Sequence, residues 1–195
     1  MTVSWQFNKP LFHKDFPADQ PVKTLLLLRH AKSAWSDPRL DDHDRHLNGR
    51  GERAAKAMAD HIAREGPRPD LILCSTAMRT RQTLAPLVKR LGSPAPPISL
   101  ENGLYLASED VLMAHIRAVA DGVPTVLLIG HTHGIGQLAA DLAGSGPSEP
   151  LAALREKYPT GTLAVLHVPD GPWSDLEVGS AKLLDFVRPR DLAVT

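Results

Sequence analysis

The chain has 195 residues, of which 43% are apolar, so it can bury one globular core but is short for two full domains. Its 22 basic and 22 acidic residues balance, with no polybasic tract, which argues against nucleic-acid and membrane-surface partners. The longest apolar stretch, around residues 24–28, is far shorter than a bilayer span, and the first residues lack the order of a signal peptide. Because Cys74 is the only cysteine, no internal disulfide can form, and we expect a cytoplasmic protein.

Apolar runs and amphipathic patterns alternate along the chain, as they do in βα units with a mostly parallel sheet. Residues 1–22 hold four aromatic residues and three prolines, and we expect them to form an arm packed on a single domain spanning 1–195. The patterns predict strands at 24–29, 70–74, 125–130 and 161–167, and helices at 48–64, 77–91, 109–120 and 135–142. Segments 92–97 and 144–150 are rich in Pro, Gly and Ser and are expected to be loops. The predicted fold class is α/β, a three-layer sandwich with a mostly parallel central sheet flanked by helices on both faces.

The first predicted strand ends in Arg29 and His30. A run of four leucines precedes the pair, which is typical of a strand buried on both faces. Both side chains therefore leave the sheet at its carboxyl edge, where open α/β sheets place their ligands. A guanidinium offers a fork of donors to phosphate oxygens, and a neutral imidazole offers a lone pair, so the pair indicates a site for a phosphoryl group.

Two further strand ends add groups of the same kind. Ser75 or Thr76 can cap the helix that follows the second strand, and Arg79 lies on the first turn of that helix, so this turn is an anion site. After the third strand, His131 follows Gly130, which allows close approach of the backbone. We therefore expect two guanidiniums and two imidazoles to meet at one edge of the sheet.

Taken together, these motifs resemble the histidine phosphatase superfamily, and most closely its short bacterial branch, the phosphohistidine phosphatases. The resemblance runs from about residue 24 onward, with the motifs Leu-Arg-His-Ala at 28–31, Asn-Gly-Arg-Gly at 48–51, Ser-Thr-Ala-Met-Arg-Thr-Arg-Gln-Thr at 75–83 and Gly-His at 130–131. It implies a phosphoglycerate mutase-like fold and a metal-independent phosphatase without a cofactor. The implied substrates are a phosphorylated protein, above all one carrying phosphohistidine, or a small phosphorylated compound; the oligomeric state stays open.

Carried over by motif position, the resemblance implies a catalytic set of His30, Arg29, Arg79 and His131. In that set the first histidine accepts the phosphoryl group, the two arginines clamp its oxygens, and the second histidine is a further donor. Ser36 and Thr132 are implied in substrate binding. The chain departs from the common pattern at Ala31, where much of the superfamily has glycine, and at Thr132 and His133, where relatives carry Gly or Asn-Pro.

The expected mechanism is a two-step covalent hydrolysis in which His30 attacks phosphorus in line and water then cleaves the phosphohistidine. Longer branches take a general acid from an insertion for which residues 92–124 are too short. A proton donor accelerates the departure of an alkoxide by roughly 10²- to 10⁴-fold, whereas phosphohistidine can expel neutral imidazole once its ring is protonated. Candidates for a proton donor are Asp37, Asp41, Asp42, Asp44, Glu101 and Glu109.

Other classes of protein fit the same residues less well. A metal-dependent hydrolase would use His131 and His133 with the Asp41–His46 cluster, although the common zinc motifs are missing; that cluster is otherwise a solvated turn in which Arg45 pairs with a carboxylate. A non-catalytic phosphate- or phosphoprotein-binding module would keep the same pocket. A cysteine phosphatase is excluded because Thr80 stands where its arginine would follow Cys74.

Overall fold

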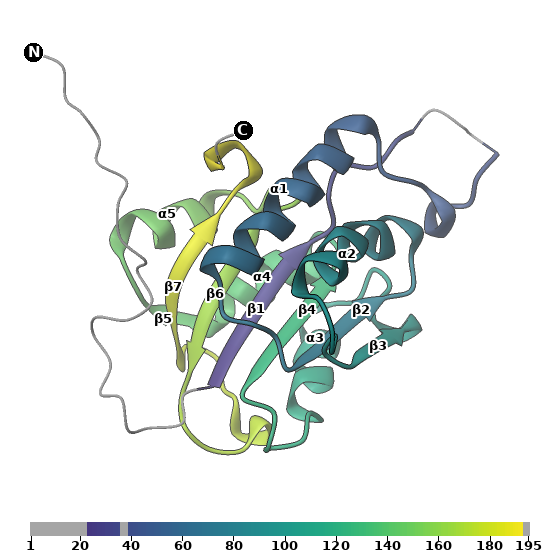
Figure 1. Cartoon of the computed structure of the whole chain (residues 1–195). Helices are drawn as coiled ribbons and strands as arrows, with labels where there is room; N and C mark the ends of the chain where they lie inside the picture. Colours follow the sequence, from purple (N-terminus) through teal and green to yellow (C-terminus); the bar gives the residue numbers. More distant parts are fainter. Residues whose placement is uncertain (1–22, 36–38, 193–195) are drawn as a thin grey trace, which may run out of the picture.

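The computed structural model describes residues 23–35 and 39–192 (Figure 1). The arm expected over residues 1–22 lies outside the described residues, as do Ser36 and Asp37. Within the described part, the chain forms a sheet with helices on both of its faces. No helix there is long and apolar enough to cross a membrane.

The sheet has seven strands in the order β3-β2-β4-β1-β6-β7-β5. Their bounds are β1 Lys23–Arg29, β2 Leu71–Ser75, β3 Ile98–Glu101, β4 Thr125–Gly130, β5 Ala143–Ser145, β6 Leu163–Val168 and β7 Ala181–Val187. Strands β3, β2, β4 and β1 run parallel, and β5 is parallel to β7. Strand β6 is antiparallel to both of its neighbours, β1 and β7, so the sheet is mixed although most of its pairs are parallel.

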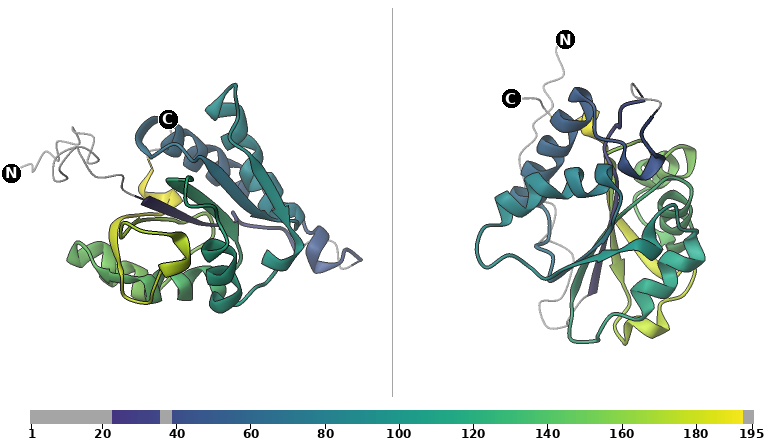
Figure 2. Two further views of the ribbon diagram at one scale, coloured as in Figure 1. Left: turned by 90° about the horizontal axis from the view of Figure 1, so that it is seen from below. Right: turned by 90° about the vertical axis from the view of Figure 1, so that its right-hand side faces the viewer.

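The described residues form five α-helices: α1 Gly49–Glu65, α2 Met78–Leu91, α3 Glu109–Arg117, α4 Gly134–Leu142 and α5 Ser148–Glu156. Short 3₁₀ turns occur at η1 Asp42–Asp44, η2 Asn102–Leu104, η3 Trp173–Asp175 and η4 Pro189–Asp191. Figure 2 shows α1 and α2 on one side of the sheet and α3 to α5 on the other. The predicted three-layer sandwich is confirmed.

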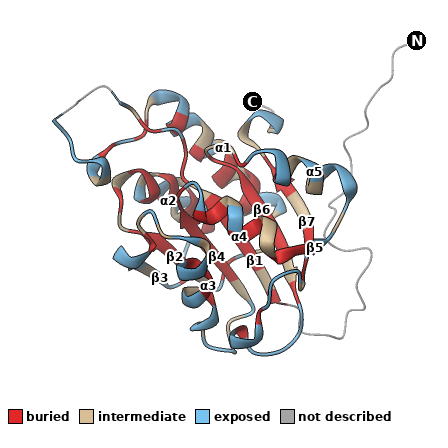
Figure 3. Cartoon of the chain, turned by 180° about the vertical axis from the view of Figure 1, so that it is seen from behind, coloured by how far each residue is buried: buried red, intermediate tan, exposed pale blue. Residues whose placement is uncertain are grey.

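The leucines of β1 explain why two layers of helices are needed. Leu25–Leu28 are at most 2% exposed, so this strand is covered on both faces. Because side chains alternate along a strand, Leu25 and Leu27 enter the core beneath α3 and α4, whereas Leu26 and Leu28 enter the core beneath α1 and α2. Figure 3 shows the resulting buried interior, with the exposed residues on the helices and loops around it.

The four predicted strands and four predicted helices are all present, with ends that differ by up to three residues. The expected loop at 144–150 is wrong, because Ala143–Ser145 pair with the edge of β7 and α5 begins at Ser148. Strands β3 and β7 were not predicted. β3 is an edge strand with exposed Ile98 and Leu100, so it lacks the apolar signature of a buried strand.

Candidate active site

Three adjacent parallel strands end at the same edge of the sheet. Arg29 pairs with Gly130 in the β1–β4 register, and the backbone N–H of His30 donates to the Gly130 carbonyl over 3.0 Å. In the β2–β4 register, Cys74 pairs with Ile129, and β2 ends at the next residue, Ser75. This alignment brings the residues that follow all three strands to one place.

His30 is held with one ring nitrogen engaged. The side chain is 7% exposed, and its Nδ1 lies 2.7 Å from the carbonyl oxygen of Ala31. Because a carbonyl can only accept, this contact assigns the proton to Nδ1 and leaves a lone pair on Nε2. Burial lowers the pKa of His30 to about 4, with smaller contributions from Arg79 and Arg29, so the ring is neutral at pH 7.

His131 faces His30 across the edge, with ring centroids 5.2 Å apart. Its Nε2 lies 2.8 Å from the Ser75 hydroxyl, while its buried Nδ1 has no hydrogen-bond partner among the described residues. Burial lowers the pKa of His131 to about 3, followed by the influence of His30 and Arg79. This second imidazole is therefore also neutral, and it keeps one nitrogen free for a ligand.

Arg29 is fixed by the segment after α5. Its Nη1 donates to the carbonyl oxygen of Tyr158 over 2.6 Å, and the Tyr158 hydroxyl in turn donates to the Leu27 carbonyl over 2.6 Å. The Nε of Arg29 is buried and without a hydrogen-bond partner among the described residues. An N–H in that state is costly unless an acceptor, such as a phosphoryl oxygen, completes it.

Arg79 projects from the first turn of α2 and is 3% exposed. Its guanidinium binds Asp42 of η1 twice: Nη1 donates to the backbone carbonyl, and Nη2 donates to the carboxylate Oδ2 over 2.9 Å. The expectation that Ser75 or Thr76 caps α2 is wrong, since Ala77 is the N-cap and makes no side-chain cap. The Ser75 hydroxyl instead contacts His131 and accepts from the Ala77 N–H over 3.4 Å.

Asp42 has three side-chain donors around one carboxylate. Besides Arg79, the Tyr105 hydroxyl donates to Oδ2 over 2.6 Å and the Arg45 Nη1 donates to Oδ1 over 2.7 Å. Burial alone would raise the pKa of Asp42, but the hydroxyl and the two guanidiniums together hold it well below its usual range. Asp42 is therefore ionised at neutral pH, which makes it an anion of the site rather than a proton donor.

Arg45 ties this loop to the end of the first strand. Its Nη2 donates to the Ser33 hydroxyl over 2.7 Å, and its Nε donates to the Ala34 carbonyl over 2.9 Å. The guanidinium carbon also lies 3.2 Å from the centroid of the exposed Trp35 ring. The prediction that Arg45 pairs with a carboxylate is confirmed, but the expectation of a merely solvated turn is wrong because its partner Asp42 also binds Arg79.

The structure brings the four predicted catalytic residues, His30, Arg29, Arg79 and His131, to one edge. Thr132 and His133 follow them on the exposed turn before α4. Ser36 lies outside the described residues, as does the acid candidate Asp37. Of the remaining acid candidates, all of them in the described part of the chain, only Asp42 bonds to a guanidinium of the site; Glu101 accepts from Ser99 instead.

No group of three His, Cys, Asp or Glu side chains within 23–35 and 39–192 is arranged to hold a metal ion. The alternative based on His131, His133 and the Asp41–His46 cluster therefore has no ligand set in this part of the chain.

Sequence reasoning missed Tyr105, which reaches Asp42 across 63 positions of the chain and stacks edge-on against His131 with centroids 5.4 Å apart. Gly134 permits the backbone of Ala107, two positions after Tyr105, to lie against the start of α4, because a Cβ there would meet the carbonyl of Ala107.

Residues 25–105 match the family model of the histidine phosphatase superfamily, branch 1. An uncharacterized protein of Mycobacterium tuberculosis is 41% identical over 165 residues, which are 84% of this chain and 100% of the relative. The structure is similar to that of a candidate phosphohistidine phosphatase SixA from Nakamurella, with TM-score 0.74 and 34% identity over 86% of this chain and 96% of the other. A candidate SixA from Agrobacterium tumefaciens gives TM-score 0.72 and 34% identity over 86% and 98%.

Proposed function

The chain belongs to the histidine phosphatase superfamily, within its short SixA-like branch, and from this premise we propose that it is a metal-independent phosphatase that acts on phosphohistidine through a covalent phosphohistidine on His30. The observation that carries the proposal is the contact between Nδ1 of His30 and the carbonyl oxygen of Ala31. Its Nδ1–H is used by the Ala31 carbonyl, so the Nε2 lone pair is available as the nucleophile.

In the first step, Nε2 of His30 attacks phosphorus as the P–N or P–O bond of the substrate breaks. A neutral ring is required, and the depressed pKa of His30 supplies it at physiological pH. The guanidiniums of Arg29 and Arg79 and the free Nδ1 of His131 stabilise the equatorial oxygens of the transferring group. In the second step, water attacks phosphorus and His30 leaves as neutral imidazole once its ring is protonated.

The choice of a P–N substrate rests on the state of Asp42. This carboxylate is ionised at neutral pH and held by three donors, so it is a poor source of the proton that an alkoxide leaving group needs. A phosphohistidine that carries a proton on its other ring nitrogen leaves as neutral imidazole and does not depend on such a donor at the bond that breaks. The names of the two relatives at 34% identity agree with this substrate class.

The proposal is tested by His30→Ala, with His115→Ala on α3 as the control for the loss of a histidine elsewhere. Turnover of a phosphohistidine protein is expected to vanish in His30→Ala and to persist in the control. Rapid quenching of wild type with ³²P-labelled substrate is expected to trap label on His30, with chelators present throughout. The proposal fails if His30→Ala keeps full activity, if chelation abolishes activity and zinc restores it, or if the pocket binds phosphopeptide without becoming labelled.

The substrate class is tested by comparing kcat/KM for phosphohistidine and for a phosphomonoester of similar size. We expect phosphohistidine to be preferred by roughly 10²-fold, which is the lower end of the rate acceleration that a positioned general acid provides. Equal rates would show that a proton donor is present after all.

A further inference from the structure

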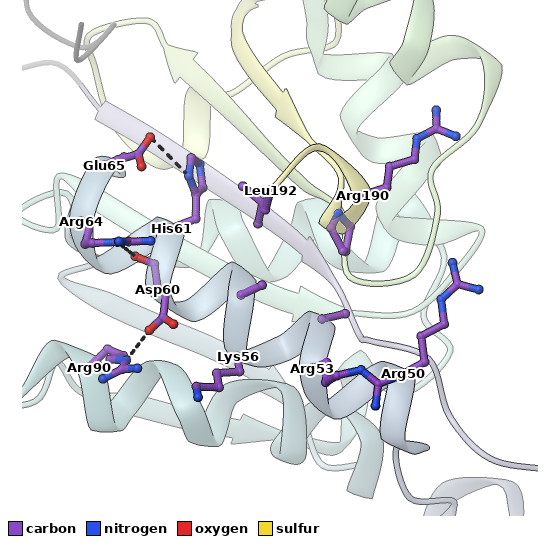
Figure 4. A pocket seen from close by; sticks show the side chains of 13 residues that line it. Arg50, Arg53, Lys56, Asp60, His61, Arg64, Glu65, Arg90, Arg190 and Leu192 are labelled. Atoms are coloured by element: carbon purple, nitrogen blue, oxygen red, sulfur yellow. Dashed lines mark hydrogen bonds and ion pairs between the residues drawn. The ribbon is translucent and has the colours of Figure 1, made fainter. Parts of the chain in front are cut away.

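A groove with cationic walls lies on the outer side of α1, away from the sheet. It is about 620 Å³ in volume and is bounded by the exposed side of α1, the end of α2 and the turn η4 (Figure 4). Its cationic lining residues are Arg50, Arg53, Lys56, Arg64, Arg90 and Arg190. Of the described carboxylates, two line it as well, those of Asp60 and Glu65.

Both carboxylates lie at one end of the groove and have partners there. Asp60 forms an ion pair with Arg90, and Glu65 lies 3.6 Å from the ring of His61. Arg50 and Arg53 at the other end, and Lys56 between the two ends, are exposed and form no ion pair among the described residues. Figure 4 shows Arg50, Arg53 and Arg190 gathered at this end, far from Glu65. The groove therefore has a strongly positive end.

That positive end adjoins the candidate active site. The α1 N-cap Asn48 donates its backbone N–H to the carbonyl of Lys32, two positions after His30. On the other side, the Gly161 N–H donates to the carbonyls of Arg29 and His30. A Cβ on Gly161 would meet both groove walls, at Ala54 and Pro189. The groove thus lies beside the backbone segment that carries the proposed nucleophile.

We propose that this groove binds an acidic segment of the phosphorylated protein substrate and so delivers its phosphohistidine to His30, an inference that rests on the proposed function. The positive charges of Arg50, Arg53 and Lys56 attract the carboxylates of the segment before the phosphoryl group docks. The carboxylates then pair with these side chains. From Arg50 to Asp60 the helix rises by about 15 Å, which an extended peptide spans with about five residues.

The same surface suits a polypeptide better than a nucleic acid. Among residues 23–35 and 39–192, none that lines the groove is Phe, Tyr or Trp, so this part of the chain offers no platform on which bases stack. Asp60 and Glu65 would repel a continuous phosphate backbone, and the chain as a whole carries no net charge. An acidic peptide can place its carboxylates at the positive end alone.

The test uses two phosphohistidine peptides of equal length, one flanked on one side by five Glu residues and the other by five Ser residues. Wild type is expected to prefer the Glu peptide in kcat/KM by at least about 10-fold at low salt, because steering by charge acts on encounter, and to lose most of the preference in 0.5 M NaCl. The double variant Arg53→Glu/Lys56→Glu is expected to abolish the preference. It should leave kcat/KM for free phosphohistidine within 2-fold of wild type. The matched control Lys89→Glu/Arg155→Glu reverses two exposed charges outside the groove and is expected to keep the preference.

Binding is measured in parallel by calorimetry with the unphosphorylated Glu peptide, which needs no turnover. Failure to hydrolyse any phosphohistidine substrate would remove the proposed function, and the groove would then be judged by this binding alone. Equal rates on the two peptides, with activity intact, would overturn the groove and leave the phosphatase standing. If a single-stranded oligonucleotide binds more tightly than the Glu peptide, and this binding is lost in the same double variant, the groove binds nucleic acid and the proposed occupant is wrong.

Discussion

Asp42 supplies a negative charge to the same guanidinium that is proposed to hold phosphate. Its carboxylate and backbone carbonyl take up both terminal nitrogens of Arg79. These bonds use two of the five N–H groups of the guanidinium, so a phosphoryl group that binds the remaining ones lies beside the Asp42 carboxylate. Since Asp42 is ionised, it also repels a phosphate dianion nearby.

Asp42→Asn is expected to tighten the binding of vanadate or inorganic phosphate by about 5-fold, since a difference of about 1 kcal/mol in competing interaction has that effect. The amide keeps the size of the side chain but removes its charge. The inhibition constant of vanadate measures the change. Asp44→Asn, in the same 3₁₀ turn but without a bond to Arg79, is the control and is expected to behave as wild type. Unchanged or weaker vanadate binding in Asp42→Asn would contradict the prediction.

The residues of the site differ in how far the sequence predicts them. His30 and His131 follow buried strands directly, and Arg79 lies on the first turn of the helix after β2, so their position at the edge is a local consequence of where each strand ends. Tyr105 comes after an exposed edge strand and a 3₁₀ turn, and its partner Asp42 precedes it by 63 positions. Such a contact depends on how β3 sits beside β2, which no local pattern encodes.

The start of α1 couples helix formation to the placement of His30. The Asn48 side chain accepts the N–H of Gly51 over 2.9 Å, and this cap begins the helix. The backbone of Lys32 lies against Gly51 so closely that a Cβ there would clash with its carbonyl. The second glycine of the motif is thus required by a close backbone approach.

Gly51→Ala is expected to lower the free energy of unfolding by about 1–3 kcal/mol, the cost of overpacking a close contact, and to reduce turnover because Lys32 follows the nucleophile closely. Gly49→Ala is the matched control, since a Cβ at Gly49 meets only the end of Arg53 at 3.7 Å. Urea denaturation followed by circular dichroism, with kcat of both variants, checks this. Equal stability of the two variants would contradict it.

The elements show a similar division between local and distant causes. Leu25–Leu28 predict β1 because a strand buried on both faces needs a continuous apolar run. The sequence Ala181–Val187 is interrupted by Lys182 and Asp185, so β7 lacks that run and is formed by its pairing with β6. Gly144 and Ser145 belong to a short strand only because β7 offers them an edge.

The stability of the whole molecule depends on pH because the buried imidazoles of His30 and His131 stay neutral. In the unfolded chain a histidine is protonated below about pH 6.5, whereas folded His30 has a pKa of about 4. Between these values the unfolded state binds a proton that the folded state does not. The free energy of unfolding therefore falls as the pH drops from 6.5 toward 4.

His30→Asn is expected to remove the contribution of this histidine, about 3 kcal/mol between pH 7 and pH 4, from that dependence. Urea denaturation by circular dichroism at intervals from pH 7.5 to 4 measures it. His115→Asn, on α3, is the control and is expected to follow the wild-type curve. A His30→Asn curve as steep as that of wild type would show that the ring is not held neutral.

Trp35 gives the molecule an intrinsic optical signal of events at the phosphate site. Its ring is 78% exposed and lies directly on the Arg45 guanidinium, which in turn holds Asp42. Trp173, by contrast, is fully buried on the other side of the sheet. An oxyanion that displaces Asp42 from Arg79 also disturbs Arg45. The fluorescence emission of Trp35 is therefore expected to change when the phosphate site is occupied. Occupancy can then be followed in real time without a label.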